Sequence, residues 1–144
     1  MDQRLLVTEE INAGSELIQR LNATLPIQAA FWLKDAYEGQ WYLYLASDQV
    51  TDGTIREGYG EVIESYNQKP DVYLTPLQVK LISLDDPLAK EALDIYERYP
   101  GYAPTFLGAR TFGGMSIEEG YLYPESIMAP ASSRIVDPGF ETTR

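Results

Sequence analysis

The sequence contains neither cysteine nor histidine. Without cysteine the chain has no disulfides, no thiolate nucleophiles and no cysteine-ligated metals. Without histidine it lacks the commonest general acid or base near neutral pH and the commonest transition-metal ligand. Hydrolytic triads and histidine-based zinc sites are therefore excluded. Carboxylates, lysine, tyrosine, serine, threonine and an oxygen-ligated Mg²⁺ or Ca²⁺ remain for any catalysis. We expect no catalytic residue, no metal and no cofactor.

Long apolar runs are also missing. No window approaches the roughly 18 apolar residues that a membrane-spanning helix requires. The N-terminal stretch has only three consecutive apolar residues before two glutamates, which is too few for the apolar part of a signal peptide. We therefore expect no membrane contact, no signal peptide and a cytoplasmic location.

Positive charge is scarce. The chain has 11 basic and 22 acidic side chains, and its formal net charge is −11 at pH 7. A field of this sign repels phosphate backbones unless a local basic patch overrides it, and the sequence shows no such patch. We expect no nucleic-acid partner, and we interpret the acidic charge as a source of solubility.

The remaining composition is that of an ordinary soluble globular protein. The chain has 144 residues, of which 44% are hydrophobic and 23% are charged, so it is about one domain long. We expect a single domain over residues 1–128. From residue 129 the periodicity is lost, and residues 129–144 are predicted to form an extended or disordered tail.

Hydrophobic periodicity predicts three helices and five strands in the order α-β-β-α-β-α-β-β. Two hairpins require antiparallel pairing, so we expect an α+β two-layer sandwich. Its mainly antiparallel five-stranded sheet would carry the helices on one face. The predicted helices cover 8–24, 54–68 and 86–99, and the predicted strands cover 27–34, 40–46, 77–84, 105–112 and 117–123.

Local signals mark several ends of these elements. Asp86 followed by Pro87 is typical of a helix start, and Thr54 with Glu57 suggests a capping box for the second helix. A "GGMS" stretch at 113–116 predicts the turn between the last two strands. Two glycines, at 58 and 60, weaken the second helix by about 1 kcal/mol each relative to alanine.

The first hairpin is rich in aromatic residues on both of its predicted faces. Alternation within each strand predicts one apolar side that packs against the helices, formed by Phe31, Leu33, Trp41, Leu43 and Leu45. The other side carries Trp32, Tyr42 and Tyr44 among polar residues. Such amphipathic rings are favoured in binding surfaces, although the tail or cross-strand ring pairing could cover them instead.

We therefore expect a non-catalytic module that binds a protein partner or a second copy of itself, as a homodimer, through an aromatic sheet face. The predicted binding residues are Trp32, Tyr42, Tyr44, Arg110, Tyr121 and Tyr123. Arg110 would orient a carboxylate of the partner. The alternative for Arg110 is a salt bridge to Glu118 or Glu119 across the last hairpin.

Two other functions stay open. In "PDVYLTPLQVK", residues Pro70, Asp71, Gln78 and Lys80 imitate metal-dependent nucleases, in which acidic groups hold Mg²⁺ and a lysine positions water. Glutamine at a metal-ligand position and the acidic charge favour a turn followed by a solvated strand residue instead. A small-molecule sensor would need a closed pocket between sheet and helices.

Three stretches, "AAFWLKDAYEGQWYLYLAS", "DDPLAKEALD" and "FLGARTFGGMSIEEGYLYP", follow one another along the chain. In this order they resemble a group of small uncharacterised bacterial proteins built on a hairpin, a helix and a closing hairpin. The resemblance covers 27–123 and implies a shared fold, with no activity, cofactor or catalytic residue. Tyr42 departs from the group, in which a basic residue follows the hairpin tryptophan, so the resemblance implies no shared use of that face.

Overall fold

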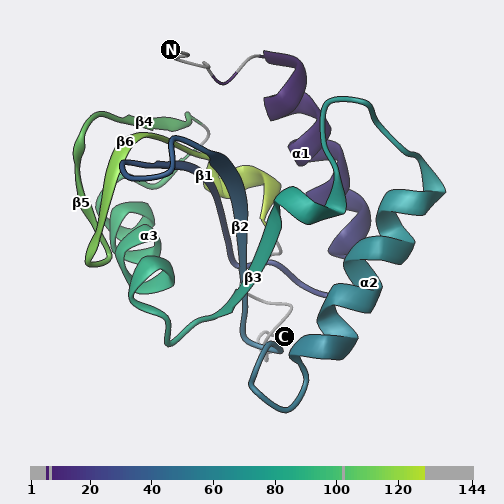
Figure 1. Ribbon diagram of the computed structural model, residues 1–144. Coiled ribbons are helices and arrows are strands. Elements are labelled where there is room, and N and C mark those ends of the chain that lie inside the picture. The colour runs from purple at the N-terminus through teal and green to yellow at the C-terminus, as the bar shows by residue number, and fades with distance from the viewer. Residues whose placement is uncertain (1–5, 7, 102, 129–144) are drawn as a thin grey trace.

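The computed structural model describes residues 6, 8–101 and 103–128. These residues form three α-helices, two 3-10 helices and six strands (Figure 1). In chain order the elements are α1 (Thr8–Leu21), β1 (Ala29–Asp35), β2 (Trp41–Ser47), α2 (Ile55–Gln68), η1 (Pro76–Gln78), β3 (Val79–Ser83), α3 (Pro87–Arg98), β4 (Thr105–Leu107), β5 (Arg110–Phe112), β6 (Met115–Leu122) and η2 (Glu125–Ile127). The tail predicted over 129–144 lies outside the described residues.

The six strands form one mixed sheet with the order β3-β2-β1-β6-β4, and β5 also pairs with β6. All pairs are antiparallel except β2 with β3, which are parallel. The α+β class and the mostly antiparallel pairing are confirmed. The β2–β3 pair is parallel because α2 carries the chain back along the sheet before β3 begins.

The prediction of five strands is wrong at the last hairpin. The single strand expected over 105–112 is divided into β4 and β5, which pair with different parts of β6. Leu107 pairs with Gly120, whereas Arg110 pairs with Ile117. The chain bends at the intervening Gly108 and Ala109, so β4 can form an edge of the sheet while β5 makes a hairpin with β6.

The expectation of helices on one face is also wrong. Helices α1 and α2 lie on one side of the sheet and α3 lies on the other (Figure 1). Strand β1 explains this arrangement, because consecutive side chains from Ala29 to Leu33 are all fully buried. A strand that is apolar in both directions needs cover on both faces of the sheet.

Two close approaches fix the helices against the sheet. A side chain at Gly14 of α1 would collide with the Tyr123 hydroxyl, so the missing Cβ lets α1 approach the sheet closely. On the other side, Gly113 lies against the backbone of Leu88 at the start of α3. Gly113 has a φ of 58° and Gly114 a φ of 85°, which confirms the turn predicted there.

The two predicted helix starts have different outcomes. Asp86 Oδ1 accepts a hydrogen bond of 2.8 Å from Leu88 N and Pro87 opens α3, as expected. The Thr54 side chain makes no capping bond to α2 and instead donates to Gln49 O at 2.7 Å. Among the helices of the described part, none is both long enough and apolar enough to cross a membrane.

Candidate functional site

The six residues predicted to form one binding face do not share a face. In the β1–β2 register, Trp32 lies opposite Leu43, and Phe31 lies opposite Tyr44. Opposed residues point to the same side of a sheet, so Trp32 points away from the side that carries Tyr42 and Tyr44. The alternation within each strand was predicted correctly, but the phase between the two strands was wrong by one residue.

Trp32 is a core residue. Its side chain is fully buried beneath α1, and its Nε1 donates a 2.9 Å hydrogen bond to the hydroxyl of Tyr123. That hydroxyl in turn donates to Ile11 O of α1 at 2.6 Å. Burial raises the pKa of Tyr123, so the hydroxyl stays protonated. Trp32 and Tyr123 therefore connect β1, β6 and α1 and are unavailable to a partner.

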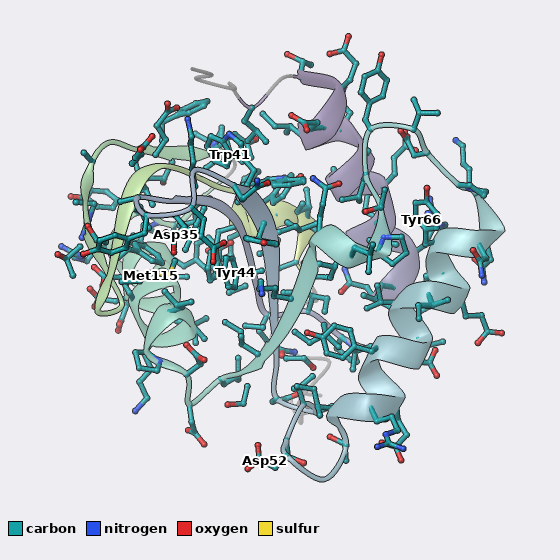
Figure 2. All side chains as sticks on the ribbon, in the orientation of Figure 1. Asp35, Trp41, Tyr44, Asp52, Tyr66 and Met115 are labelled. Carbon is teal, nitrogen blue, oxygen red and sulfur yellow. The ribbon has the colours of Figure 1, made fainter. Side chains whose placement is uncertain are left out.

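Tyr44 lies on the face of the sheet that α3 covers (Figure 2). Tyr42 lies on the same face, because it is two residues away in β2 and pairs with Leu33. Tyr44 is buried and stacks on Phe31 with ring centroids 5.5 Å apart. Burial first and the nearby Asp35 second raise the pKa of Tyr44 from 10.0 to about 12. Tyr42 is half-buried, and Lys80 Nζ lies 4.4 Å from the centroid of its ring.

Arg110 has a different ionic partner from those expected. Its Nη2 lies 2.7 Å from Glu91 Oε2 of α3, while Glu118 binds the buried Lys34 at 3.3 Å. Glu91 Oε1 also accepts a 2.7 Å hydrogen bond from Gly113 N. Strand β5 turns Arg110 toward α3 rather than across the hairpin, so its guanidinium attaches the β5–β6 turn to that helix.

Tyr121 is the inner member of an aromatic row that reaches the surface. Its ring meets those of Tyr123 and Phe106 edge to face, each at 5.1 Å between centroids. Tyr121 is 8% exposed, whereas Phe106 on β4 is 74% exposed. Phe106 is thus an exposed aromatic residue at this end of the sheet, and no pattern in the sequence indicated it.

The residues of the nuclease-like pattern serve local structure. Asp71 Oδ1 accepts a 2.8 Å hydrogen bond from Tyr73 N, and Gln78 Oε1 accepts one of 3.0 Å from Thr75 N. The Lys80 side chain of β3 lies over the Tyr42 ring of β2. Over residues 6, 8–101 and 103–128 there is no group of three or more acidic side chains placed to hold a metal ion.

An apolar groove between α2 and the start of β3 was not predicted. It has a volume of about 410 Å³ and is lined by Tyr59, Val62, Ile63, Pro76, Leu77, Val79 and Lys80. Ile63 is 48% exposed and Leu77 is 90% exposed at its rim. The sequence pattern placed Leu77 in a strand, but β3 begins at Val79 and Leu77 belongs to η1.

The connection that presents Leu77 is held by its own hydrogen bonds. Tyr66 lies between α2 and this connection (Figure 2), and its hydroxyl donates to Asp71 O at 2.7 Å. The same hydroxyl accepts from Asp71 N at 3.2 Å. The side chains of Thr75 and Gln78 form a capping box around η1. The apolar rim is therefore presented on a fixed backbone rather than on a loose loop.

Two further hollows lie at other edges of the molecule. One, of about 540 Å³ at the ends of β2 and β3, is lined by four aspartates together with apolar residues of α2 and β3. One of these, Asp86, already caps α3. The other hollow, of about 460 Å³, lies beside β4 and is lined by Tyr99, Pro100, Ala103, Pro104, Thr105 and Phe106.

Comparison with known proteins found no family model, no curated protein and no solved structure that matches the chain.

Proposed function

We propose that this protein is a non-catalytic binding module that holds an apolar side chain of a protein partner in the groove between α2 and β3. The observation that carries the proposal is the 90% exposure of Leu77 at the rim of an apolar groove of about 410 Å³. Exposed apolar surface of this kind marks binding sites when it is concentrated around a hollow.

The rigidity of the groove supports a binding role. Tyr59 and Tyr66 of α2 bond to backbone atoms on the opposite wall, at Leu81 N and at Asp71. A partner would therefore meet a surface that needs little ordering, which reduces the entropic cost of association. Apolar anchors that fill preformed hollows are typical of the residues that dominate binding energy.

The charge of Lys80 does not enter the groove. Its pairing with Tyr44 and its position over the Tyr42 ring place the Lys80 ammonium group on the α3 face of β3, opposite the face that carries α2. The groove is therefore apolar, and the partner segment that fits best presents an apolar side chain.

The test compares two exposed residues of the same connection. Leu77 lines the groove, and Val72, which is also 90% exposed, does not. We expect Leu77→Asp to weaken partner binding about tenfold or more, because it places a charge where an apolar side chain binds. Val72→Asp should leave binding unchanged.

The measurement has two stages. Partners are first captured from native cells with the wild-type protein, and the dissociation constant of the purified partner is then measured for both variants. Circular dichroism checks that the variants are folded, which both should be because both sites are exposed. Equal affinities for the Leu77→Asp and Val72→Asp proteins would contradict the proposal.

A further inference from the structure

The two edges of the sheet differ in how they meet solvent. Strand β3 forms one edge, and its outward Leu81 N is occupied by the Tyr59 hydroxyl of α2 at 3.0 Å. Strand β4 forms the other edge, and in the described part of the chain the sheet order β3-β2-β1-β6-β4 has no further strand beyond it. An edge without cover is a template for pairing with another strand.

The direction of the β4 backbone groups follows from a hydrogen bond at the end of β6. Tyr123 N donates to Ala30 O at 3.0 Å, so Tyr123 directs its backbone groups toward β1. Because directions alternate along an antiparallel strand, Tyr121 also points to β1, while Gly120 and Leu122 point to β4. Leu122 pairs with Thr105 and Gly120 with Leu107. The N–H and C=O of Phe106, between these two pairs, therefore point away from the sheet.

No described residue forms a hydrogen bond with the outward N–H or C=O of Phe106. Apart from bonds along strands and helices, Phe106 N and Phe106 O have no hydrogen bond within 6, 8–101 and 103–128. Its side chain is 74% exposed and rests on Tyr121 beside the hollow of about 460 Å³. Backbone and side chain at Phe106 are thus both available to a partner.

Charge points to a second copy as that partner. No charged residue occurs from 99 to 109, in a chain that is 23% charged. Arg98 and Arg110 bound this stretch, and each is already paired with a carboxylate of α3. Two copies with a net charge of −11 each repel one another, and the repulsion is least where the contact surface is uncharged.

We propose that two copies of this chain pair through β4 in antiparallel orientation, with Phe106 on the two-fold axis. The N–H of each Phe106 would donate to the C=O of the other, which joins the two sheets into one. The two rings would lie side by side as a cross-strand pair. A two-fold axis requires a self-complementary surface, and one outward donor next to one outward acceptor meets this condition. The groove at β3 lies at the opposite edge, so this proposal does not depend on the proposed function.

The experiment measures association of the full-length protein by sedimentation from about 1 μM to about 1 mM. A three-residue strand pair is small, so we expect a dimer dissociation constant on the order of 10 μM or weaker. Raising salt from about 0.05 M to about 0.5 M should tighten the dimer several-fold, because salt screens the repulsion between acidic copies.

Two variants test whether the backbone N–H and the side chain of Phe106 hold the dimer together. Phe106→Pro removes the outward N–H without touching the bonds to β6, and Phe106→Glu places two like charges on the axis. Each should weaken the dimer about tenfold or more. Tyr37→Ser, at a residue that is 87% exposed on the first hairpin, should leave it unchanged.

Amide hydrogen exchange locates the contact. In the wild-type protein the exchange of the Phe106 amide should slow as concentration rises, while that of Leu107 should not depend on concentration. A monomer at all concentrations would overturn the proposal, as would a dimer that both Phe106 variants leave intact. The proposal would also be overturned if the protein stayed monomeric and the Phe106 amide were protected from exchange only by a strand of another protein.

Discussion

At the scale of single residues, the Tyr123 hydroxyl connects β1 and β6 to α1. It accepts a hydrogen bond from Trp32 Nε1 and donates one to Ile11 O, and Gly14 provides the space that it occupies. Buried indole and phenol groups usually have such partners because an unpaired one is costly. Trp32 and Tyr123, which were expected to bind a partner, thus stabilise the core.

Tyr123→Phe tests this role. The change removes the acceptor of Trp32 Nε1, which leaves the buried indole N–H unpaired, and it removes the donor to Ile11 O, which lies within α1. We expect the free energy of unfolding to fall by about 1–3 kcal/mol, measured by urea denaturation. Tyr37→Phe, at a residue that is 87% exposed, is the matched control and should have no effect. A loss no larger than that of the control would show that the hydroxyl bonds contribute nothing.

At the scale of elements, α2 contains two glycines with opposite surroundings. A Cβ at Gly58 would lie 2.8 Å from Leu81 Cδ1 of β3, whereas a Cβ at Gly60 would have nothing within 4 Å. Glycine at 58 is therefore explained by the close approach of α2 to the sheet. Glycine at 60 only costs helix stability. The sequence predicted the same cost for both, because propensity is a local property.

Alanine at each position should separate these effects. Gly60→Ala should stabilise the protein by about 0.5–1 kcal/mol, because it reduces the entropy of the unfolded chain at an open helix position. Gly58→Ala should be less stable than Gly60→Ala by at least about 1 kcal/mol, because it pushes against the buried Leu81. Thermal and urea unfolding of both variants measure the difference. Equal stabilities would mean that Leu81 moves aside without cost.

The β1–β2 hairpin shows what the alternation of apolar residues can and cannot predict about the faces of a sheet. Alternation correctly separated Phe31 from Trp32 and Trp41 from Tyr42 onto opposite faces within each strand. It could not relate one strand to the other, because that register depends on how many residues the turn takes up. A shift of one residue moved Tyr42 and Tyr44 to the face of Phe31.

At the scale of the whole molecule, buried tyrosines couple folding to alkaline pH. Burial, followed by Asp35, raises the pKa of Tyr44 to about 12, and burial raises those of Tyr96 and Tyr123 as well. An unfolded tyrosine ionises at about 10. Between these values the unfolded chain has lost protons that the folded chain retains, so stability falls as pH rises.

We expect the free energy of unfolding to be unaffected by these groups below pH 10 and to fall between about pH 10 and pH 12. Urea denaturation across this range measures the slope. Tyr44→Phe should make the slope shallower, because one titrating group is gone, and Tyr37→Phe should not. A slope that Tyr44→Phe leaves unchanged would show that Tyr44 ionises without unfolding.

Much of the fold and little of the candidate site could be predicted from the sequence. The cap at Asp86, the glycine turn at 113–114 and the α+β class were predicted from signals within a few residues. Leu77 was placed in a strand because its neighbours have high β propensity, although η1 turns it to the surface. Phe106 was not selected, because the break between β4 and β5 that makes it an edge residue depends on pairing with β6.

The sequence by itself determined the acidic charge, the absence of cysteine and histidine chemistry, and the position of the helices and most strands along the chain. These properties depend on composition and on short-range periodicity, which the chain carries wherever it folds. The tertiary structure decided which aromatic residues are buried, that both faces of the sheet are covered, and where the groove and the open β4 edge lie. Burial and strand register arise from contacts between residues far apart in sequence, such as Trp32 with Tyr123, and no local pattern contains them.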